Sequence, residues 1–161
     1  DKYKYKGIFG IDFVFDREKK LIYPIELNPR LLGTTQMYMT LQNESNEPPL
    51  IGFHILEFLN AEYKINIDEL NNRIKKEKKG AHIILRNKYN KDISIKKTLR
   101  PGVYTFKDNE LVFLRSGYCL RHIKDKRKEL VITSVPQKRK VFEPNSQLIR
   151  IHTYNKVLKK D

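Results

Sequence analysis

Residues 10–30, which read GIDFVFDREKKLIYPIELNPR, consist of two apolar runs in which polar residues recur at alternate positions. Such runs on either side of a short charged stretch predict two antiparallel strands and a tight turn. A turn centred on Lys19 would bury one continuous apolar face. The pairs on that face would be Ile11 with Leu27, Phe13 with Ile25, and Phe15 with Tyr23.

The same register places Asp12 directly opposite Glu26 on the other face, with Asn28 and Arg30 further along that line. Like charges that face each other across two strands are destabilising. A divalent cation between the two carboxylates would remove the conflict, and hard oxygen ligands suit Mg²⁺ or Mn²⁺. The pairing alone leaves two interpretations open, a metal site and a solvated strand edge.

The order of residue types in this segment resembles the metal-binding hairpin of the ATP-grasp superfamily. The matching strings are Gly-x-Asp-Phe at residues 10–13 and Glu-x-Asn-Pro-Arg at residues 26–30. Biotin carboxylase, carbamoyl-phosphate synthase and D-alanine–D-alanine ligase belong to that superfamily. The resemblance covers residues 6–36, including the small residues that follow Arg30.

The resemblance implies a ligand set and a reaction. Asp12, Glu26 and Asn28 would hold Mg²⁺ or Mn²⁺ against the phosphates of ATP, and Arg30 would be the catalytic residue that contacts phosphate or a carboxylate substrate. The implied enzyme is an ATP-dependent ligase. ATP would convert a small-molecule carboxylate into an acyl phosphate, which an amine or similar nucleophile would then attack. Such phosphoryl transfer depends chiefly on positioning and charge neutralisation.

Superfamily members bind the adenine and the phosphates with a region that precedes this hairpin. Only nine residues precede Gly10 here, and no glycine-rich phosphate loop occurs elsewhere. We therefore expect the C-terminal portion of a larger ligase, a fragment that is inactive alone and needs the missing N-terminal region of the same protein. A degenerate protein that stands alone is the alternative.

The remaining pattern predicts helices first and strands afterwards. Residues 34–42 are expected to begin a short helix, and residues 49–63 to form a helix in which His54 serves packing rather than ligand binding. A further helix would open at Ile67 with Asp68 as N-cap and end at Gly80. The expected strands are residues 81–85, 103–106, 111–114, 130–135 and 148–154.

These elements predict an α+β fold with two domains. Residues 1–80 would be the C-terminal part of an ATP-grasp domain, in which the metal hairpin belongs to a larger sheet and two helices cover it. Residues 81–161 would be a basic, β-rich subdomain. No apolar run is long enough to span a membrane, so we expect a cytoplasmic protein without a membrane partner.

Cysteine and histidine offer little recognisable chemistry. The single cysteine, Cys119, excludes an internal disulfide and has no histidine and acid partners at a known motif spacing, so nucleophilic catalysis is not expected. The four histidines are too dispersed to predict a zinc site. Arg100, Arg115 and Arg121 are interpreted as solvated arginines rather than as phosphate ligands.

The net charge of +14 is concentrated in one part of the chain, because residues 1–70 carry −3 and residues 71–161 carry +17. Such asymmetry suggests a polyanionic partner. Basic clusters occur at residues 75–79, 124–128 and 138–140. ATP or an acidic substrate would account for this charge. The alternative function is a non-catalytic basic β module that binds RNA or another polyanion.

Overall fold

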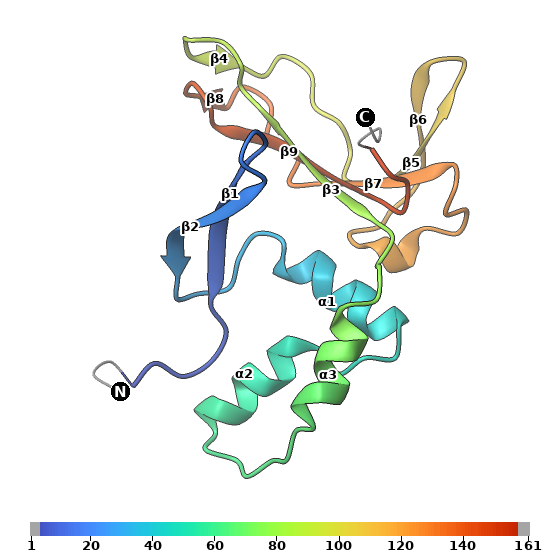
Figure 1. The fold of residues 1–161 in the computed structure, drawn as a ribbon. Coiled ribbons are helices and arrows are strands. Elements are labelled where there is room, and N and C mark those ends of the chain that lie inside the picture. The colour runs from blue at the N-terminus through green and yellow to red at the C-terminus, as the bar shows by residue number, and fades with distance from the viewer. Residues whose placement is uncertain (1–3, 158–161) are drawn as a thin grey trace. The chain divides into compact units, whose positions relative to one another are not determined.

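A computed structural model describes residues 4–157 of the chain (Figure 1). The chain divides into two compact units, residues 1–77 and residues 78–161. The division falls three residues before the expected boundary at residue 80. All three described α-helices lie in the first unit and most strands lie in the second, so the fold belongs to the α+β class.

The N-terminal unit opens with the predicted hairpin, formed by β1 (Gly10–Asp16) and β2 (Leu21–Asn28). Its turn is closed by a side chain, because Asp16 Oδ1 accepts hydrogen bonds of 3.0 Å from the backbone N–H groups of Glu18 and Lys19. Lys20 completes the turn with φ of 54°, the left-handed conformation common at the end of a hairpin loop.

The predicted register is confirmed at one end of the hairpin and wrong at the other. The confirmed pairs are Ile11 with Leu27 and Asp12 with Glu26, whereas Phe13 pairs with Pro24 and Phe15 with Ile22. A β-bulge between these two regions leaves Ile25 as an extra residue in β2. Pro24 has no N–H group to donate to the ladder, which explains why the regular pairing breaks beside it.

Three helices follow, α1 (Thr35–Glu44), α2 (Leu50–Phe58) and α3 (Ile67–Ile74). The helix predicted over residues 49–63 ends five residues early. The third helix begins where predicted, but its N-cap is Asn66, whose side chain accepts a 3.0 Å hydrogen bond from Glu69 N–H, and not Asp68. It stops at Ile74, well before the predicted end at Gly80.

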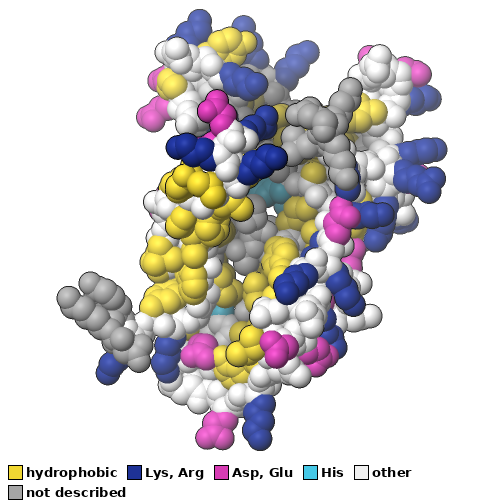
Figure 2. All heavy atoms as spheres, in the orientation of Figure 1, with side chains coloured by type: hydrophobic (Ala, Val, Ile, Leu, Met, Phe, Trp, Pro, Cys, Tyr) yellow, Lys and Arg dark blue, Asp and Glu magenta, His cyan; other side chains and the backbone are white. Residues whose placement is uncertain are grey.

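In the part of the chain that the structure describes, the hairpin forms a two-stranded sheet of its own, whereas the expectation was a larger sheet. Among residues 4–157, β1 and β2 pair only with each other. Their apolar side chains are 40–64% exposed, and Figure 2 shows the hydrophobic surface that they form. The residues concerned are Ile11, Phe13, Val14, Phe15, Leu21, Ile22, Tyr23, Ile25 and Leu27.

The C-terminal unit is built on a five-stranded antiparallel sheet with the strand order β3-β9-β7-β5-β6. All five strands lie where the sequence predicts strands. Their bounds are β3 Ala81–Arg86, β5 Gly102–Lys107, β6 Glu110–Arg115, β7 Glu129–Thr133 and β9 Gln147–Thr153. The core of the C-terminal unit includes Val103, Val131 and Ile132, which are at most 1% exposed.

Two further features complete this unit. The turn between β5 and β6 places Asp108 and Asn109 at φ of 50° and 64°, the pair of left-handed residues that a tight hairpin requires. A second, two-stranded sheet joins β4 (Ile93–Ser94) to β8 (Val141–Phe142), which the sequence did not predict.

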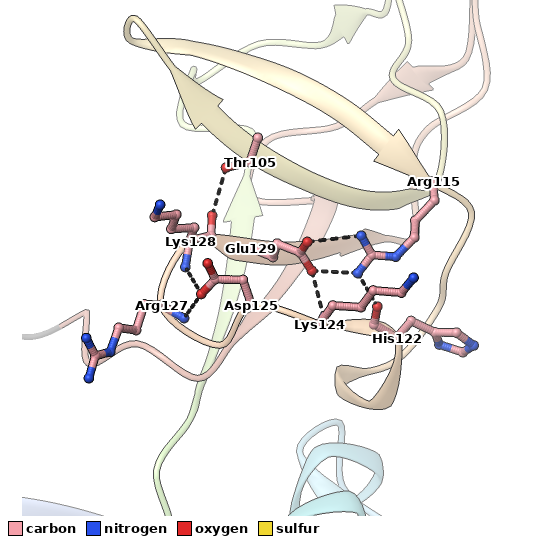
Figure 3. A network of polar contacts seen from close by, with 8 residues as sticks. All are labelled: Thr105, Arg115, His122, Lys124, Asp125, Arg127, Lys128 and Glu129. Atoms are coloured by element: carbon pink, nitrogen blue, oxygen red, sulfur yellow. Dashed lines mark hydrogen bonds and ion pairs between the residues drawn. The ribbon is translucent and has the colours of Figure 1, made fainter.

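A partly buried ion pair fixes the long connection between β6 and β7, which contains the short 3₁₀-helix η1 (Leu120–His122). Arg115 binds both carboxylate oxygens of Glu129 and also donates a 2.6 Å hydrogen bond to the backbone oxygen of His122 (Figure 3). Lys124 N–H donates to the same carboxylate over 2.7 Å. Arg115 is thus a structural residue, and its interpretation as a solvated arginine is wrong.

No helix in the described part of the chain combines the length and the apolar character that crossing a membrane requires. The longest described helix, α1, has 10 residues. A membrane-spanning helix needs about 20.

Candidate functional site

The two carboxylates of the predicted site lie opposite each other near the open end of the hairpin. Asp12 pairs with Glu26 in the β1–β2 ladder. Side chains at such positions have Cβ atoms about 4.5–5.5 Å apart. Both residues are exposed, and within residues 4–157 neither forms an ion pair with lysine or arginine. Among the described residues, no lysine or arginine is therefore placed to offset the repulsion expected of two opposed carboxylates.

Two hydrogen bonds connect Asp12 to Asn28 and Asn28 to Arg30 on the same side of the hairpin. Asn28 Nδ2 donates to Asp12 Oδ2 over 3.3 Å, and Arg30 Nη2 donates to Asn28 Oδ1 over 3.1 Å. Asn28 is only 6% exposed, so this amide is held in place by its surroundings. The structure thus links Asp12, Asn28 and Arg30 by a series of hydrogen bonds. Glu26 lies opposite Asp12 on the neighbouring strand.

The backbone after β2 turns sharply and so places Arg30 beside Asn28. Arg30 N–H donates a 2.8 Å hydrogen bond to the backbone oxygen of Asn28, which closes a three-residue turn around Pro29. Gly10 pairs with Asn28 and lies under Leu32, where a Cβ atom would be 2.2 Å from Leu32 Cδ1. A glycine at this position therefore permits the close approach of the returning chain.

The β-bulge at Ile25 adjoins Glu26 and was missed by the sequence analysis. A bulge bends its strand and changes the direction of nearby side chains, and bulges are frequent beside active sites. Pro24 was the available signal, because proline inside a sheet is confined to edges, strand starts and bulges. The bulge separates the confirmed pair of Asp12 with Glu26 from the apolar pairs whose register differs from the prediction.

The donor set fits a small hard cation. Mg²⁺ commonly uses one or two carboxylates from the protein and completes its octahedron with waters and phosphate oxygens. Asp12 and Glu26 supply the carboxylates. Asn28 Oδ1 accepts from Arg30 in this structure, so it would have to leave Arg30 to reach a metal. Residues 4–157 hold no cluster of three or more histidine, cysteine or acidic side chains arranged for a metal ion.

His54 serves packing, as the sequence analysis expected. Its Nδ1 accepts a 3.1 Å hydrogen bond from the backbone N–H of Ile8, and its ring lies edge-on to Phe58 with the centroids 4.8 Å apart. These contacts fix the segment before β1 against α2. The imidazole is thus a structural group within the N-terminal unit.

Two dispersed histidines meet in the C-terminal sheet, which the sequence analysis missed. His82 on β3 pairs with His152 on β9, and their rings stack with centroids 4.7 Å apart and an interplanar angle of 21°. Burial, together with the charges of His82 and Arg150, lowers the pKa of His152 to about 4. Burial and Arg150 also lower the pKa of His82, whose Nε2 is buried without a hydrogen-bond partner.

Cys119 lies beside a histidine, a contact that the sequence analysis did not predict. Its Sγ lies 3.3 Å from Nδ1 of His122, the last residue of η1. The same nitrogen lies 3.5 Å from the backbone N–H of Tyr118. The spacing of three residues between Cys119 and His122 was the available signal, because one turn of a 3₁₀-helix brings such residues onto one face.

The hairpin therefore presents two opposed carboxylates, a buried amide and an arginine at one end of a small sheet. This arrangement can hold a hard divalent cation and offer a guanidinium group beside it. Comparison of the chain with protein-family models, with curated proteins and with solved structures gives no match.

Proposed function

We propose that the hairpin is the Mg²⁺-binding half of an ATP-dependent ligase of the ATP-grasp type. Such an enzyme activates a carboxylate as an acyl phosphate, which an amine or similar nucleophile then attacks. The observation that supports this proposal is the pairing of Asp12 with Glu26 in the observed ladder, next to the hydrogen-bonded series from Asp12 through Asn28 to Arg30.

Each of the four residues has a distinct role in this proposal. Asp12 and Glu26 bind the cation, which would neutralise charge on the β- and γ-phosphates of ATP. Asn28 Oδ1 holds the Arg30 guanidinium in this structure, and on release from Arg30 it would offer the cation a neutral oxygen, which limits the negative charge beside the nucleotide. Arg30 has the planar fork of donors that binds a phosphate or carboxylate in a bidentate manner.

The proposed ligase also needs groups that bind the adenine and the phosphates. We assign these groups to another region of the same protein. The exposed apolar side chains on β1 and β2 favour this assignment, because an isolated two-stranded hairpin is at best marginally stable in water. A further part of the ATP-binding domain would bury this surface.

The first test is metal binding by the chain itself. We expect Mn²⁺ to broaden the NMR signals of the Asp12 and Glu26 backbone amides selectively, because the ion lies beside them. Glu26→Gln should weaken this binding by about tenfold or more, since it removes one charged ligand of the pair. Glu18→Gln is the matched control, because Glu18 lies in the turn at the other end of the hairpin. Equal broadening in wild type and Glu26→Gln would contradict the ligand assignment.

The second test is turnover in the full-length protein. Glu26→Gln should lower ATP-dependent product formation by more than about 100-fold while the fold is retained, which is the size expected when a transition-state charge loses its stabilisation. Release of inorganic phosphate with candidate carboxylates and amines provides the measurement. Full activity of this variant would show that Glu26 does not hold the catalytic metal.

A further inference from the structure

The loop after β3 is held rigidly by one buried side chain. Asn87, which is 3% exposed, donates through Nδ2 to the backbone oxygens of Lys91, Phe142 and Glu143 over 3.0–3.1 Å. Its Oδ1 accepts a 3.0 Å hydrogen bond from Tyr89 N–H. The backbones of Asn87 and Asn145 are also joined, by a 2.9 Å hydrogen bond. The loop therefore has a defined shape against the end of β8.

This ordered loop presents an aromatic ring to solvent. Tyr89 is 65% exposed, although the loop that carries it is anchored on both sides. The ring borders a groove of about 880 Å³, whose lining includes Arg86, Lys88, Pro144 and Leu148. The groove thus combines an exposed aromatic face, apolar side chains and two cations.

The β4–β8 ladder, to which Asn87 anchors the loop through Phe142, brings two further basic segments together. Arg139 N–H donates to the backbone oxygen of Ile95 over 2.9 Å, and Ile95 N–H donates to that of Lys140 over 3.3 Å. Residues 96 and 97 therefore lie alongside residues 138–140. The two segments are more than forty positions apart in the sequence, so their proximity is a property of the fold.

Positive charge dominates this region, which we name the β4–β8 face and define as residues 86–97 and 138–145. Its two acidic residues are Asp92 and Glu143. Its basic residues, all exposed, are Arg86, Lys88, Lys91, Lys96, Lys97, Lys138, Arg139 and Lys140. Figure 2 shows lysine and arginine side chains gathered around β4 and β8, whose places Figure 1 gives. The face is thus suited to a polyanion.

We propose that the β4–β8 face binds single-stranded nucleic acid, with Tyr89 stacked on an unpaired base and the surrounding cations on the phosphates. Binding of this type combines a basic groove with aromatic rings on which bases stack. A duplex keeps its bases stacked internally and offers no free base face to Tyr89. An acidic peptide would satisfy the cations and leave the ring unused. This function is independent of the proposed ligase site, since it involves no hairpin residue.

The test measures binding of the intact chain to a labelled oligouridylate of about 12 nucleotides by fluorescence anisotropy, with EDTA present to exclude metal effects. We expect Tyr89→Ala to raise Kd by about tenfold, the loss typical of one base–aromatic stack, and Tyr89→Phe to retain wild-type affinity. Oligothymidylate of the same length shows whether the face also accepts DNA, and binding of either strand with this dependence on Tyr89 supports the proposal.

Charge variants test whether the basic side chains of the β4–β8 face bind the phosphates. Replacing Lys138, Arg139 and Lys140 by glutamine should weaken binding and lower the slope of log Kd against log salt by about 2, measured between about 50 and 200 mM salt. The matched control replaces Lys124, Arg127 and Lys128 by glutamine, which removes the same charge from another exposed segment of the unit. NMR spectra of each variant establish that the sheet is intact.

Any one of the following outcomes would overturn the proposal. The first is absence of oligonucleotide binding at low salt. The second is equal weakening by the two triple variants, which would indicate general electrostatic attraction without a defined face. The third is a Tyr89→Ala variant that binds as wild type does, or displacement of the oligonucleotide by polyglutamate at equal charge concentration.

Discussion

Replacing Arg115 by methionine is expected to lower the free energy of unfolding of the C-terminal unit measurably, because it leaves the Glu129 carboxylate without its partner. Glu129 is 8% exposed and Arg115 binds both of its oxygens. The expected loss is smaller than that for a fully buried pair, since the Arg115 side chain is 28% exposed and water screens its charge. The substitution preserves most of the apolar stem of Arg115.

Urea unfolding followed in NMR spectra measures this loss, because resolved signals from β5 and β7 report on the C-terminal unit alone. The double variant Arg115→Met, Glu129→Leu should recover much of the stability, since it removes the stranded charge. Arg121→Met is the control, because it removes an exposed arginine from the same connection. If Arg115→Met and Arg121→Met are equally stable, the ion pair does not hold the connection.

The difference in stability between Arg115→Met and the wild-type protein should also depend on pH. Hydrogen bonds from Arg115, with those from the backbone N–H groups of Lys124 and Asp125, lower the pKa of Glu129 from 4.5 to about 2 against the opposing effect of burial. The ionised carboxylate therefore stabilises the folded unit above about pH 4.5, and this contribution is lost as the pH falls towards 2. The loss of stability in Arg115→Met relative to wild type should therefore become smaller as the pH falls from about 4.5 to 2.

The C-terminal unit is expected to lose about 3 kcal/mol of stability between neutral pH and pH 4 because of His152. Its pKa falls from 6.5 to about 4 on folding, chiefly through burial, and the side chain is only 5% exposed. The unfolded chain therefore binds the proton first as the pH falls. Stability is fully present above about pH 6.5 and declines as the pH approaches 4. The pKa of His82 is also lowered on folding, which adds to the loss of stability as the pH falls.

Neighbouring charges do not offset this effect. Arg150 lies on the same face of β9 as His152 and disfavours a second positive charge. Glu129 lies on the same face of β7, but it is bound by Arg115. His152→Phe keeps a ring beside His82 and should flatten the pH profile between pH 6.5 and 4.

The measurement is urea unfolding across this pH range, again read from signals of the C-terminal unit. His54→Asn, which changes a histidine of the N-terminal unit, should leave the profile of the C-terminal unit unchanged. A His152→Phe variant with the wild-type pH dependence would show that His152 is not the group that titrates.

Local patterns in the sequence were sufficient to predict much of the fold. The strands of the C-terminal unit carry continuous or alternating apolar residues, and the Asp108–Asn109 turn has the residue types that left-handed conformations favour. The pairing of Asp12 with Glu26 followed from alternation and from a turn centred on Lys19, because β-strand side chains have a period of two. These features depend on residues close together in the chain.

Features that depend on competing or distant interactions were not predicted. Asn66 and Asp68 are both good N-cap residues, and only the observed hydrogen bond to Glu69 N–H distinguishes them. The bulge at Ile25 changed the register because a proline disrupted a pattern that otherwise favoured regular pairing. The stacking of His82 on His152 joins the first and last strands of the C-terminal unit, and no local pattern encodes such a contact.

The site was predicted in part for the same reason. The carboxylate pair and its neighbours lie within one hairpin, so their proximity followed from strand periodicity. The bond from Arg30 to Asn28 depends on the turn around Pro29 and on the space above Gly10, which the residue pattern does not specify. Arg115 was misinterpreted because its acidic partner lies fourteen positions away on another strand.

The position of β9 in the sheet affects the order in which the C-terminal unit can form during protein synthesis. β9 is the last strand of the unit to leave the ribosome, yet it lies between β3 and β7. Until residues 147–153 emerge, β3 has no partner strand, and its backbone groups stay exposed to other chains or to chaperones. Sheet assembly is therefore a late event of high contact order. A premature stop codon before residue 147 would divide the sheet rather than trim its edge.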